Sequence, residues 1–217
     1  MRVRVKVCGV TRPEDARAAV AAGADAIGLN FVRPSPRCLK SWDQARAVLA
    51  GTQPFAGLVV GLFVNPTLEE ILNAVRELEF DALQLHGEEP PEWGDELRKR
   101  IALPLWKAYR IATRADVEAA MAQDWPCDAL LLDARVDGAH GGTGQSFDWD
   151  LLSDFPRTKT LVLAGGLTPE NVADAVRRVR PDWVDTASGV ESVPGIKDAA
   201  RMRAFVAAAK AGDVSDG

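Results

Sequence analysis

Apolar segments alternate with amphipathic ones along nearly the whole chain. Eight short apolar segments predict β-strands: VRVKVC (3–8), ADAIGLNF (24–31), LVVGLFV (58–64), DALQL (81–85), PLWKAY (104–109), DALLLD (128–133), TLVLA (160–164) and WVDTA (183–187). Patterns of helical period lie between them, for example at 13–23, 67–78 and 168–179. Near-continuous apolar strands separated by such helices are typical of a parallel sheet covered by helices. Eight strands in this rhythm favour a closed barrel over an open sheet, so we predict an α/β fold, a single (β/α)8 TIM barrel.

The length of the chain fits one domain of this kind. A (β/α)8 barrel typically takes about 200 to 400 residues, and the 217 residues here contain no linker rich in Ser, Gly or Pro. We therefore expect a barrel over residues 1–210 and a flexible C-terminal tail over 211–217.

Two late strand-to-helix junctions contain glycines. The strand ending at Ala164 is followed by Gly165-Gly166, and the segment from Thr168 predicts a helix start with a proline at its first position. The last strand is followed by Ser188-Gly189. Glycine lets the backbone approach a ligand closely, and a helix N-terminus offers unpaired N–H groups. Because adjacent turns of this kind bind phosphate in many (β/α)8 barrels, we expect a phosphorylated small molecule as substrate.

Composition excludes several other functions. The formal net charge is −5 and there is no long basic run, which argues against a nucleic-acid partner. No apolar stretch approaches the ~18 residues of a membrane span, so we expect no membrane contact and a cytoplasmic location. Three cysteines are too few for a disulfide scaffold, and two histidines without metal-ligand spacing predict no metal site.

Two strand ends carry candidate acid–base groups. A lone cysteine in a strand is more often a small buried hydrophobe, but Cys8 ends the first strand directly before Gly9, and Lys6 shares its face. Asp133 ends a strongly apolar strand and is either a cap or a catalytic acid. The glycine-rich segment GGTG (141–144) follows it and is of the kind that closes over a ligand.

Arg37 is a candidate for binding an anion. It lies in FVRPSPRCL (31–39), where two prolines stiffen the approach to it. Its guanidinium presents a planar fork suited to a carboxylate or phosphate. The alternative interpretation is a surface arginine paired with a neighbouring acid.

Together these motifs resemble one family, phosphoribosylanthranilate isomerase of tryptophan biosynthesis. The resemblance runs from about Lys6 to the helix around 197–206. The matching segments, in order, are KVCGVT (6–11), SPR (35–37), VGLFVN (60–65), LQLHGEE (83–89), LLLDA (130–134), GGTGQSFDW (141–149), LAGGLTPENV (163–172) and SGVESVPGIKD (188–198). Each segment is weak alone, but the ordered set is highly specific.

The resemblance implies a role for each matching position. Cys8 falls on the family's general base and Asp133 on its general acid. Arg37 falls on the arginine expected to bind the substrate's anthranilate carboxylate, and His86 on a substrate contact. The phosphate is expected on backbone N–H groups around Gly165, Gly166, Ser188 and Gly189. Two departures from the family pattern, Ala187 and the segment 32–34, touch neither the acid nor the base.

The reaction implied is an Amadori rearrangement, in which an aminoaldose becomes an aminoketose. The nitrogen of the substrate serves as the electron sink, so no cofactor and no metal are expected. For Cys8 to act as a base, its pKa should be lowered toward neutrality, and we expect Lys6 or a nearby positive dipole to contribute to that.

Rival functions remain open at this stage. An indole-glycerol-phosphate synthase would be longer and would use lysine and glutamate, and a pentose-phosphate epimerase would need metal ligands. A binding-only barrel would have little reason to keep both Cys8 and Asp133. The related isomerase of histidine biosynthesis uses a pair of aspartates, so Cys8 favours the anthranilate substrate but leaves a side activity open. The chain is expected to be a monomer or a homodimer.

Overall fold

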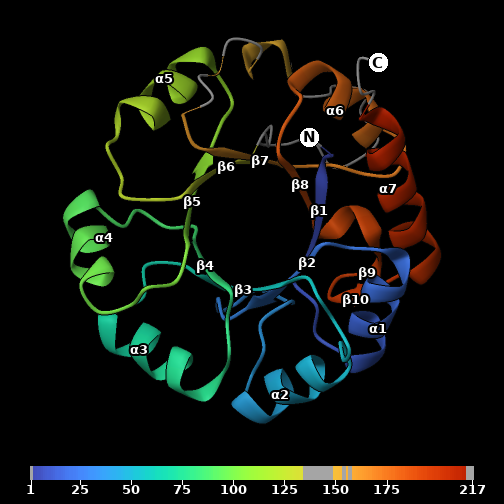
Figure 1. Ribbon diagram of the computed structural model, residues 1–217, viewed down its shortest axis with the longest axis horizontal. Coiled ribbons are helices and arrows are strands. Elements are labelled where there is room, and N and C mark those ends of the chain that lie inside the picture. The colour runs from blue at the N-terminus through green and yellow to red at the C-terminus, as the bar shows by residue number, and fades with distance from the viewer. Residues whose placement is uncertain (1, 134–148, 153–154, 156–157, 214–217) are drawn as a thin grey trace.

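The computed structural model describes residues 2–133, 149–152, 155 and 158–213. Eight parallel strands form a closed barrel in which each strand pairs with the next along the chain and β8 pairs with β1 (Figure 1). The strands are β1 (Arg4–Cys8), β2 (Ala26–Asn30), β3 (Leu58–Phe63), β4 (Ala82–Leu85), β5 (Leu105–Arg110), β6 (Ala129–Asp133), β7 (Thr160–Ala164) and β8 (Trp183–Thr186). The predicted TIM barrel is confirmed, and each strand lies within two residues of its predicted bounds.

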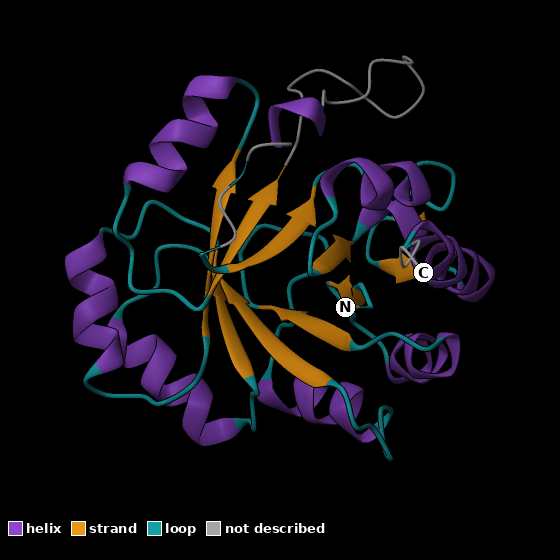
Figure 2. Ribbon diagram, turned by 45° about the horizontal axis from the view of Figure 1, so that its top comes forward, coloured by secondary structure: helices purple, strands orange, loops and turns teal. Residues whose placement is uncertain are grey.

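Helices surround the barrel and cover the outer face of its strands (Figures 1 and 2). They are α1 (Pro13–Ala22), α2 (Trp42–Ala50), α3 (Leu68–Glu77), α4 (Pro91–Arg98), α5 (Arg114–Ala122), α6 (Val172–Val179) and α7 (Ala199–Gly212), with short 3-10 turns η1 (Trp149–Leu152) and η2 (Ser188–Val190). A two-stranded hairpin, β9 (Glu191–Val193) and β10 (Ile196–Lys197), lies between η2 and α7. This hairpin matters for the site, because it brings charged side chains to the end of β1.

Side chains divide into two cores according to the face of the strand that bears them. Odd positions such as Val5 and Val7 of β1 join the large core between strands and helices. A smaller core fills the barrel interior and contains Trp106, Leu131 and Val162 among others. This alternation means that Cys8 and Lys6, on the other face of β1 from Val5 and Val7, point into the barrel interior.

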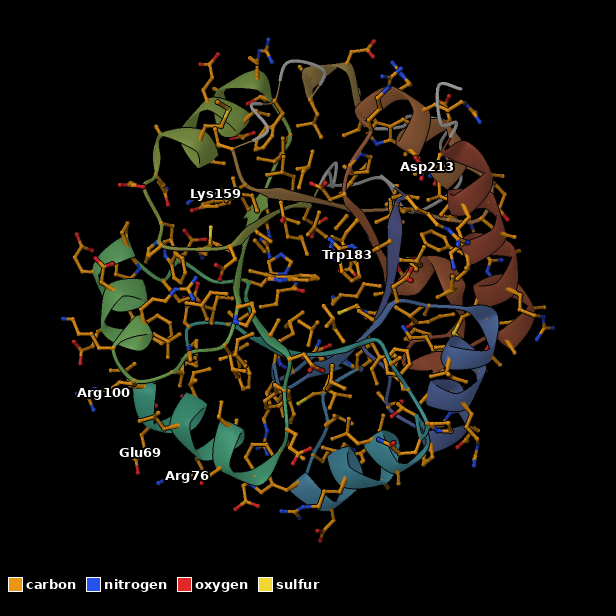
Figure 3. All side chains as sticks on the ribbon, in the orientation of Figure 1. Glu69, Arg76, Arg100, Lys159, Trp183 and Asp213 are labelled. Carbon is orange, nitrogen blue, oxygen red and sulfur yellow. The ribbon has the colours of Figure 1, made fainter. Side chains whose placement is uncertain are left out.

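Aromatic packing closes the end of the barrel where the strands begin. Trp183 opens β8 inside the ring of strands (Figure 3) and packs against Trp106 with ring centroids 5.3 Å apart. The guanidinium carbon of Arg4 lies 4.2 Å from the Trp183 ring centroid. The other end, at which the strands finish, is the mouth available for chemistry.

Two boundaries differ from the prediction. Helix α6 begins at Val172 rather than near Thr168, because the segment from 168 first forms a turn in which the Thr168 N–H donates to Asn171 Oδ1 (2.8 Å). At the C-terminal end, α7 continues to Gly212 and Asp213 accepts a hydrogen bond from the Val3 N–H (2.7 Å), so residues 211–213 pack on the barrel instead of belonging to the predicted tail at 211–217. Residues 214–217 lie outside the described part of the chain.

Among the described residues, no helix combines the length and apolar character needed to cross a membrane.

Candidate active site

Cys8 ends β1 inside the mouth, in a closely packed position. Its side chain is buried, and a Cβ added to Gly28 on the neighbouring strand would lie 2.8 Å from the Cys8 sulfur. Below it, Lys6 Nζ donates a hydrogen bond to Asp185 Oδ1 of β8 at 3.0 Å, and the Lys6 side chain is fully buried. Burial alone would lower the pKa of Lys6, but the Asp185 carboxylate raises it above its ordinary value. The lysine is therefore a fixed cation beneath the thiol.

The pKa of Cys8 differs from the expectation. Burial raises the pKa of the Cys8 thiol, and Lys6, which acts to lower it, does not overcome that effect. The physical reason is that Lys6 is committed to Asp185, whose negative charge also acts to raise the thiol pKa. The expected lowering toward neutrality is wrong for this state of the site.

Arg37 lies beside Cys8 and is held by an acid from the β9–β10 hairpin. Its Nε and Nη2 donate to the two carboxylate oxygens of Glu191, each at 2.7 Å, and its side chain packs against Gly9. Glu191 also accepts from Lys197 Nζ at 2.9 Å. Burial opposes its ionisation, but Arg37 and Lys197 together hold the pKa of Glu191 below its usual range. Arg37 is therefore paired with an acid, as the alternative interpretation has it, and its Nη1 does not donate to that acid. The binding of an anion by Arg37 stays a prediction.

The opposite side of the mouth carries Asp133 and His86. Asp133 ends β6, His86 follows β4, and His86 Nε2 lies 3.5 Å from Asp133 Oδ2. On its other side, His86 Nδ1 lies 3.5 Å from the amide nitrogen of Gln84, which is buried. His86 and Asp133 are also within electrostatic reach of Asp185. The carboxyl of Asp133 thus stands three strands from Cys8 across one mouth.

The predicted phosphate-binding turns follow β7 and β8. Gly165 and Gly166 have φ of 91° and 65°, the left-handed region that glycine tolerates. In the described part of the chain, apart from Gly166 and the residues on either side of it, no heavy atom lies within 4 Å of a Cβ built on Gly166. Gly189 is packed against the Leu167 carbonyl, which also accepts a hydrogen bond from Thr186 Oγ1 at 2.9 Å. Ser188 opens the turn η2 beside it. The two turns are therefore joined through Leu167, with Gly166 facing open space.

Sequence reasoning missed three residues of this site. Glu191 and Lys197 lie within the quoted segment SGVESVPGIKD, and they pair with each other. The pairing of Glu191 with Arg37 spans 154 positions and has no local signal. Gln84 is the polar residue in the otherwise apolar strand segment ALQL. A polar residue in such a segment could have been recognised from the sequence as a candidate site residue. The GGTG segment at 141–144 lies outside the described residues.

In the part of the chain that the structure describes, no group of three or more His, Cys, Asp or Glu side chains could hold a metal ion. The expectation of a metal-free site stays a prediction.

Comparison with known proteins gives a consistent result over nearly the full chain. The family model of N-(5'phosphoribosyl)anthranilate (PRA) isomerase matches residues 5–208. A relative from Pseudomonas fluorescens (strain Pf0-1), an N-(5'-phosphoribosyl)anthranilate isomerase, is 47% identical over 211 residues, covering 96% of this chain and 98% of the relative.

Solved structures agree. The crystal structure of phosphoribosyl anthranilate isomerase from Thermotoga maritima superimposes with a TM-score of 0.85 at 41% identity, covering 96% of this chain and 98% of that chain. A phosphoribosyl anthranilate isomerase in complex with reduced 1-(o-carboxyphenylamino)-1-deoxyribulose 5-phosphate gives a TM-score of 0.82 at 39% identity, with the same coverage. The resemblance inferred from the motifs is confirmed: this chain belongs to the phosphoribosylanthranilate isomerase family.

Proposed function

We propose that this enzyme rearranges N-(5-phosphoribosyl)anthranilate to 1-(2-carboxyphenylamino)-1-deoxyribulose 5-phosphate in tryptophan biosynthesis, with Cys8 as general base and Asp133 as general acid. The observation that carries the proposal is the pair formed by the Cys8 thiol and the Asp133 carboxyl, which end β1 and β6 across one mouth. A relative solved in complex with reduced 1-(o-carboxyphenylamino)-1-deoxyribulose 5-phosphate supports the substrate class.

Asp133 begins the reaction by protonating the ring oxygen of the ribose. The bond between C1 and that oxygen breaks, and the nitrogen lone pair forms an iminium with C1. The positive iminium makes the proton on C2 acidic, so that the Cys8 thiolate removes it. The electron pair of the C2–H bond becomes the C1–C2 double bond of an enolamine, while the C1–N double-bond pair returns to nitrogen. The enolamine then tautomerises to the ketone, as the proton of the C2 hydroxyl is lost and C1 gains a proton. No external oxidant or reductant is needed, and no cofactor is expected.

The two ends of the substrate are charged, and the mouth offers a partner for each. Arg37 retains three N–H donors beyond the two that Glu191 accepts, including both on Nη1. A carboxylate can accept from that remaining edge in the bidentate manner typical of arginine. At the other end, the backbone around Gly165, Gly166, Ser188 and Gly189 would receive the phosphate, and His86 would contact the ribose region.

The raised pKa of Cys8 has a consequence for the base step. In the empty site the thiol form prevails at neutral pH, so the active thiolate is a minor species. A thiol of higher pKa is a stronger base once ionised, and the iminium formed nearby would favour the thiolate.

Turnover of freshly prepared phosphoribosylanthranilate, followed by its fluorescence, tests the proposal. Wild type should turn over without added metal or cofactor, and Cys8→Ser and Asp133→Asn should each lose about 10²- to 10⁴-fold in kcat. Cys38→Ser is the matched control, because that half-buried cysteine donates its hydrogen bond to the neighbouring Leu39 carbonyl and has no proposed role in proton transfer. Absence of turnover by folded wild type would refute the substrate, and a near-normal Cys8→Ser would refute the base. Cytoplasmic location, oligomeric state and side activity on the histidine-pathway substrate stay predictions.

A further inference from the structure

Gln84 occupies a position where an amide is costly. It lies on β4 between Leu83 and Leu85 of the outer core, so its side chain points into the barrel interior, where it is 1% exposed. Burying an amide in apolar surroundings costs free energy unless its donors and acceptors are paired. Among the described residues, its Oε1 is a buried oxygen without a hydrogen-bond partner. A purely structural amide would be expected to have both ends satisfied.

The amide has one polar neighbour of functional interest. Its nitrogen lies 3.5 Å from His86 Nδ1, and the other ring nitrogen of His86 lies 3.5 Å from Asp133 Oδ2. An amide nitrogen can only donate, so this arrangement requires Nδ1 to carry a lone pair. In a neutral imidazole the proton then resides on Nε2, which faces Asp133.

We propose that Gln84 is a positioning residue that fixes the Nε2–H tautomer of His86 and thereby directs a neutral hydrogen-bond donor at the carboxyl of Asp133. This inference rests on the proposed role of Asp133 as general acid. With Oδ2 occupied by His86, the other carboxyl oxygen of Asp133 is the one that delivers the proton to the substrate.

The effect on the reaction follows from the change in charge at Asp133. As Asp133 gives up its proton it becomes a carboxylate, and a carboxylate accepts a hydrogen bond more strongly than the acid does. The contact from His86 Nε2–H therefore strengthens during proton transfer, which stabilises the transition state more than the ground state. Contacts that are long in an empty site often shorten when substrate is bound.

The reverse orientation of the amide is the alternative. If Oε1 faced His86 Nδ1–H, the buried amide N–H groups would lack an acceptor, which is rarer in proteins than an unpaired oxygen. The lone pair of Nε2 would then face Asp133, and two acceptors would oppose each other once Asp133 had lost its proton. The first orientation of the amide favours the loss of a proton by Asp133, whereas the second opposes it.

Nitrogen-15 NMR of histidine-labelled protein reads the tautomer directly, because the two ring nitrogens shift differently when protonated. The chain has two histidines, His86 and His140, so a His140→Gln variant leaves one signal pair to assign. Without substrate and near neutral pH, we expect Nε2 protonated and Nδ1 unprotonated. An Nδ1–H tautomer in the wild-type protein would overturn the proposal, whatever the variants do.

Two substitutions of similar size test whether Gln84 causes the tautomer. Gln84→Glu supplies an acceptor in place of the donor, so Nδ1 should become protonated and kcat should fall about tenfold or more. Gln84→Met removes both functions, so the tautomers should mix and kcat should fall less. KM should change little in both, because the residue acts on proton transfer rather than on binding.

Thermal unfolding of both variants separates this role from stability. A Gln84→Met protein that folds, keeps a pure Nε2–H tautomer and retains kcat would show that another group fixes His86, and the proposal would be wrong. Failure of the proposed function would be seen differently, as an absence of turnover by the wild-type protein. The tautomer of His86 is measured without substrate and so does not depend on that turnover.

Discussion

The two sides of the mouth are built differently. We call Lys6, Cys8 and Asp185 the base side, and Gln84, His86 and Asp133 the acid side. On the base side the ion pair has an N–O distance of 3.0 Å, and its side chains are 0% and 9% exposed. On the acid side His86 and Asp133 are 3.5 Å apart, and their side chains are 20% and 17% exposed.

The difference corresponds to the proposed order of the reaction. The acid must meet the ring oxygen first, so an accessible carboxyl with a long contact can adjust to the substrate. The base acts on a C–H bond only after the iminium has formed, so the thiol can be held in a fixed position from which water is excluded, beside a paired cation. The comparison therefore predicts that substitutions on the base side affect folding strongly, whereas those on the acid side mainly affect turnover.

Lys6→Met should give the largest effect on stability. It leaves the Asp185 carboxylate buried without its cation, so the free energy of unfolding should fall by about 3–5 kcal/mol in urea titration. The double variant Lys6→Met/Asp185→Leu should recover most of that loss, because no buried charge remains.

The control for this prediction lies on the acid side. His86→Gln removes a long, partly exposed contact and should lower the free energy of unfolding by less than about 1 kcal/mol. If Lys6→Met cost no more than His86→Gln, the proposed contrast between the two sides would be wrong.

Local patterns were enough to predict the barrel and the positions of its acid–base candidates. The β1 segment ends in Cys8 and the β6 segment in Asp133 because a buried apolar run stops where the chain leaves the sheet, and that change is visible in the sequence. Sequence alone could assign these residues to strand ends, and the family resemblance supplied their roles.

Properties that depend on distant parts of the chain could not be predicted in this way. The pairing of Arg37 with Glu191 depends on a hairpin 154 positions away. The direction of the Cys8 pKa depends on whether burial or Lys6 dominates, and Lys6 turned out to be paired with Asp185. The α6 start at Val172 reflects side-chain hydrogen bonds around Asn171 that compete with helical ones.

Substitutions at Arg37 and Glu191 should produce an intermediate effect on substrate binding. Arg37→Lys loses the planar fork, and Glu191→Gln loses the charge that orients it, so KM should rise by about 10- to 100-fold, the equivalent of a hydrogen bond to a charged group. Steady-state kinetics should show a smaller change in kcat, because neither residue transfers a proton.

Two controls sharpen this prediction. Arg33→Lys changes an exposed arginine of the same loop and should leave KM unchanged. A phosphoribosyl aniline, which lacks the carboxylate, should bind wild type and Arg37→Lys equally well. If Arg37→Lys weakened the binding of both substrates equally, Arg37 would have a structural role and would not recognise the carboxylate.

The smallest expected effect is a displacement of the pH profile on the base side. Because burial raises the pKa of Cys8, and the thiolate is the active form, the thiolate fraction at a given pH is lower than for an ordinary cysteine. The acid limb of kcat/KM should therefore lie at higher pH than the ordinary thiol pKa of about 8.5 would give. The rate at which a small thiol-reactive reagent modifies Cys8, followed against pH in a Cys38→Ser/Cys127→Ala variant, measures the same ionisation without substrate.

Lys6 determines how far this displacement goes. Its charge acts to lower the thiol pKa, so Lys6→Met should move the midpoint of thiol reactivity to still higher pH, provided that it is measured well below the unfolding temperature. His86→Gln should leave the midpoint nearly unchanged, because His86 lies on the acid side. A wild-type midpoint below the ordinary value would mean that the cation outweighs burial, and the base side would then hold a preformed thiolate rather than a protected thiol.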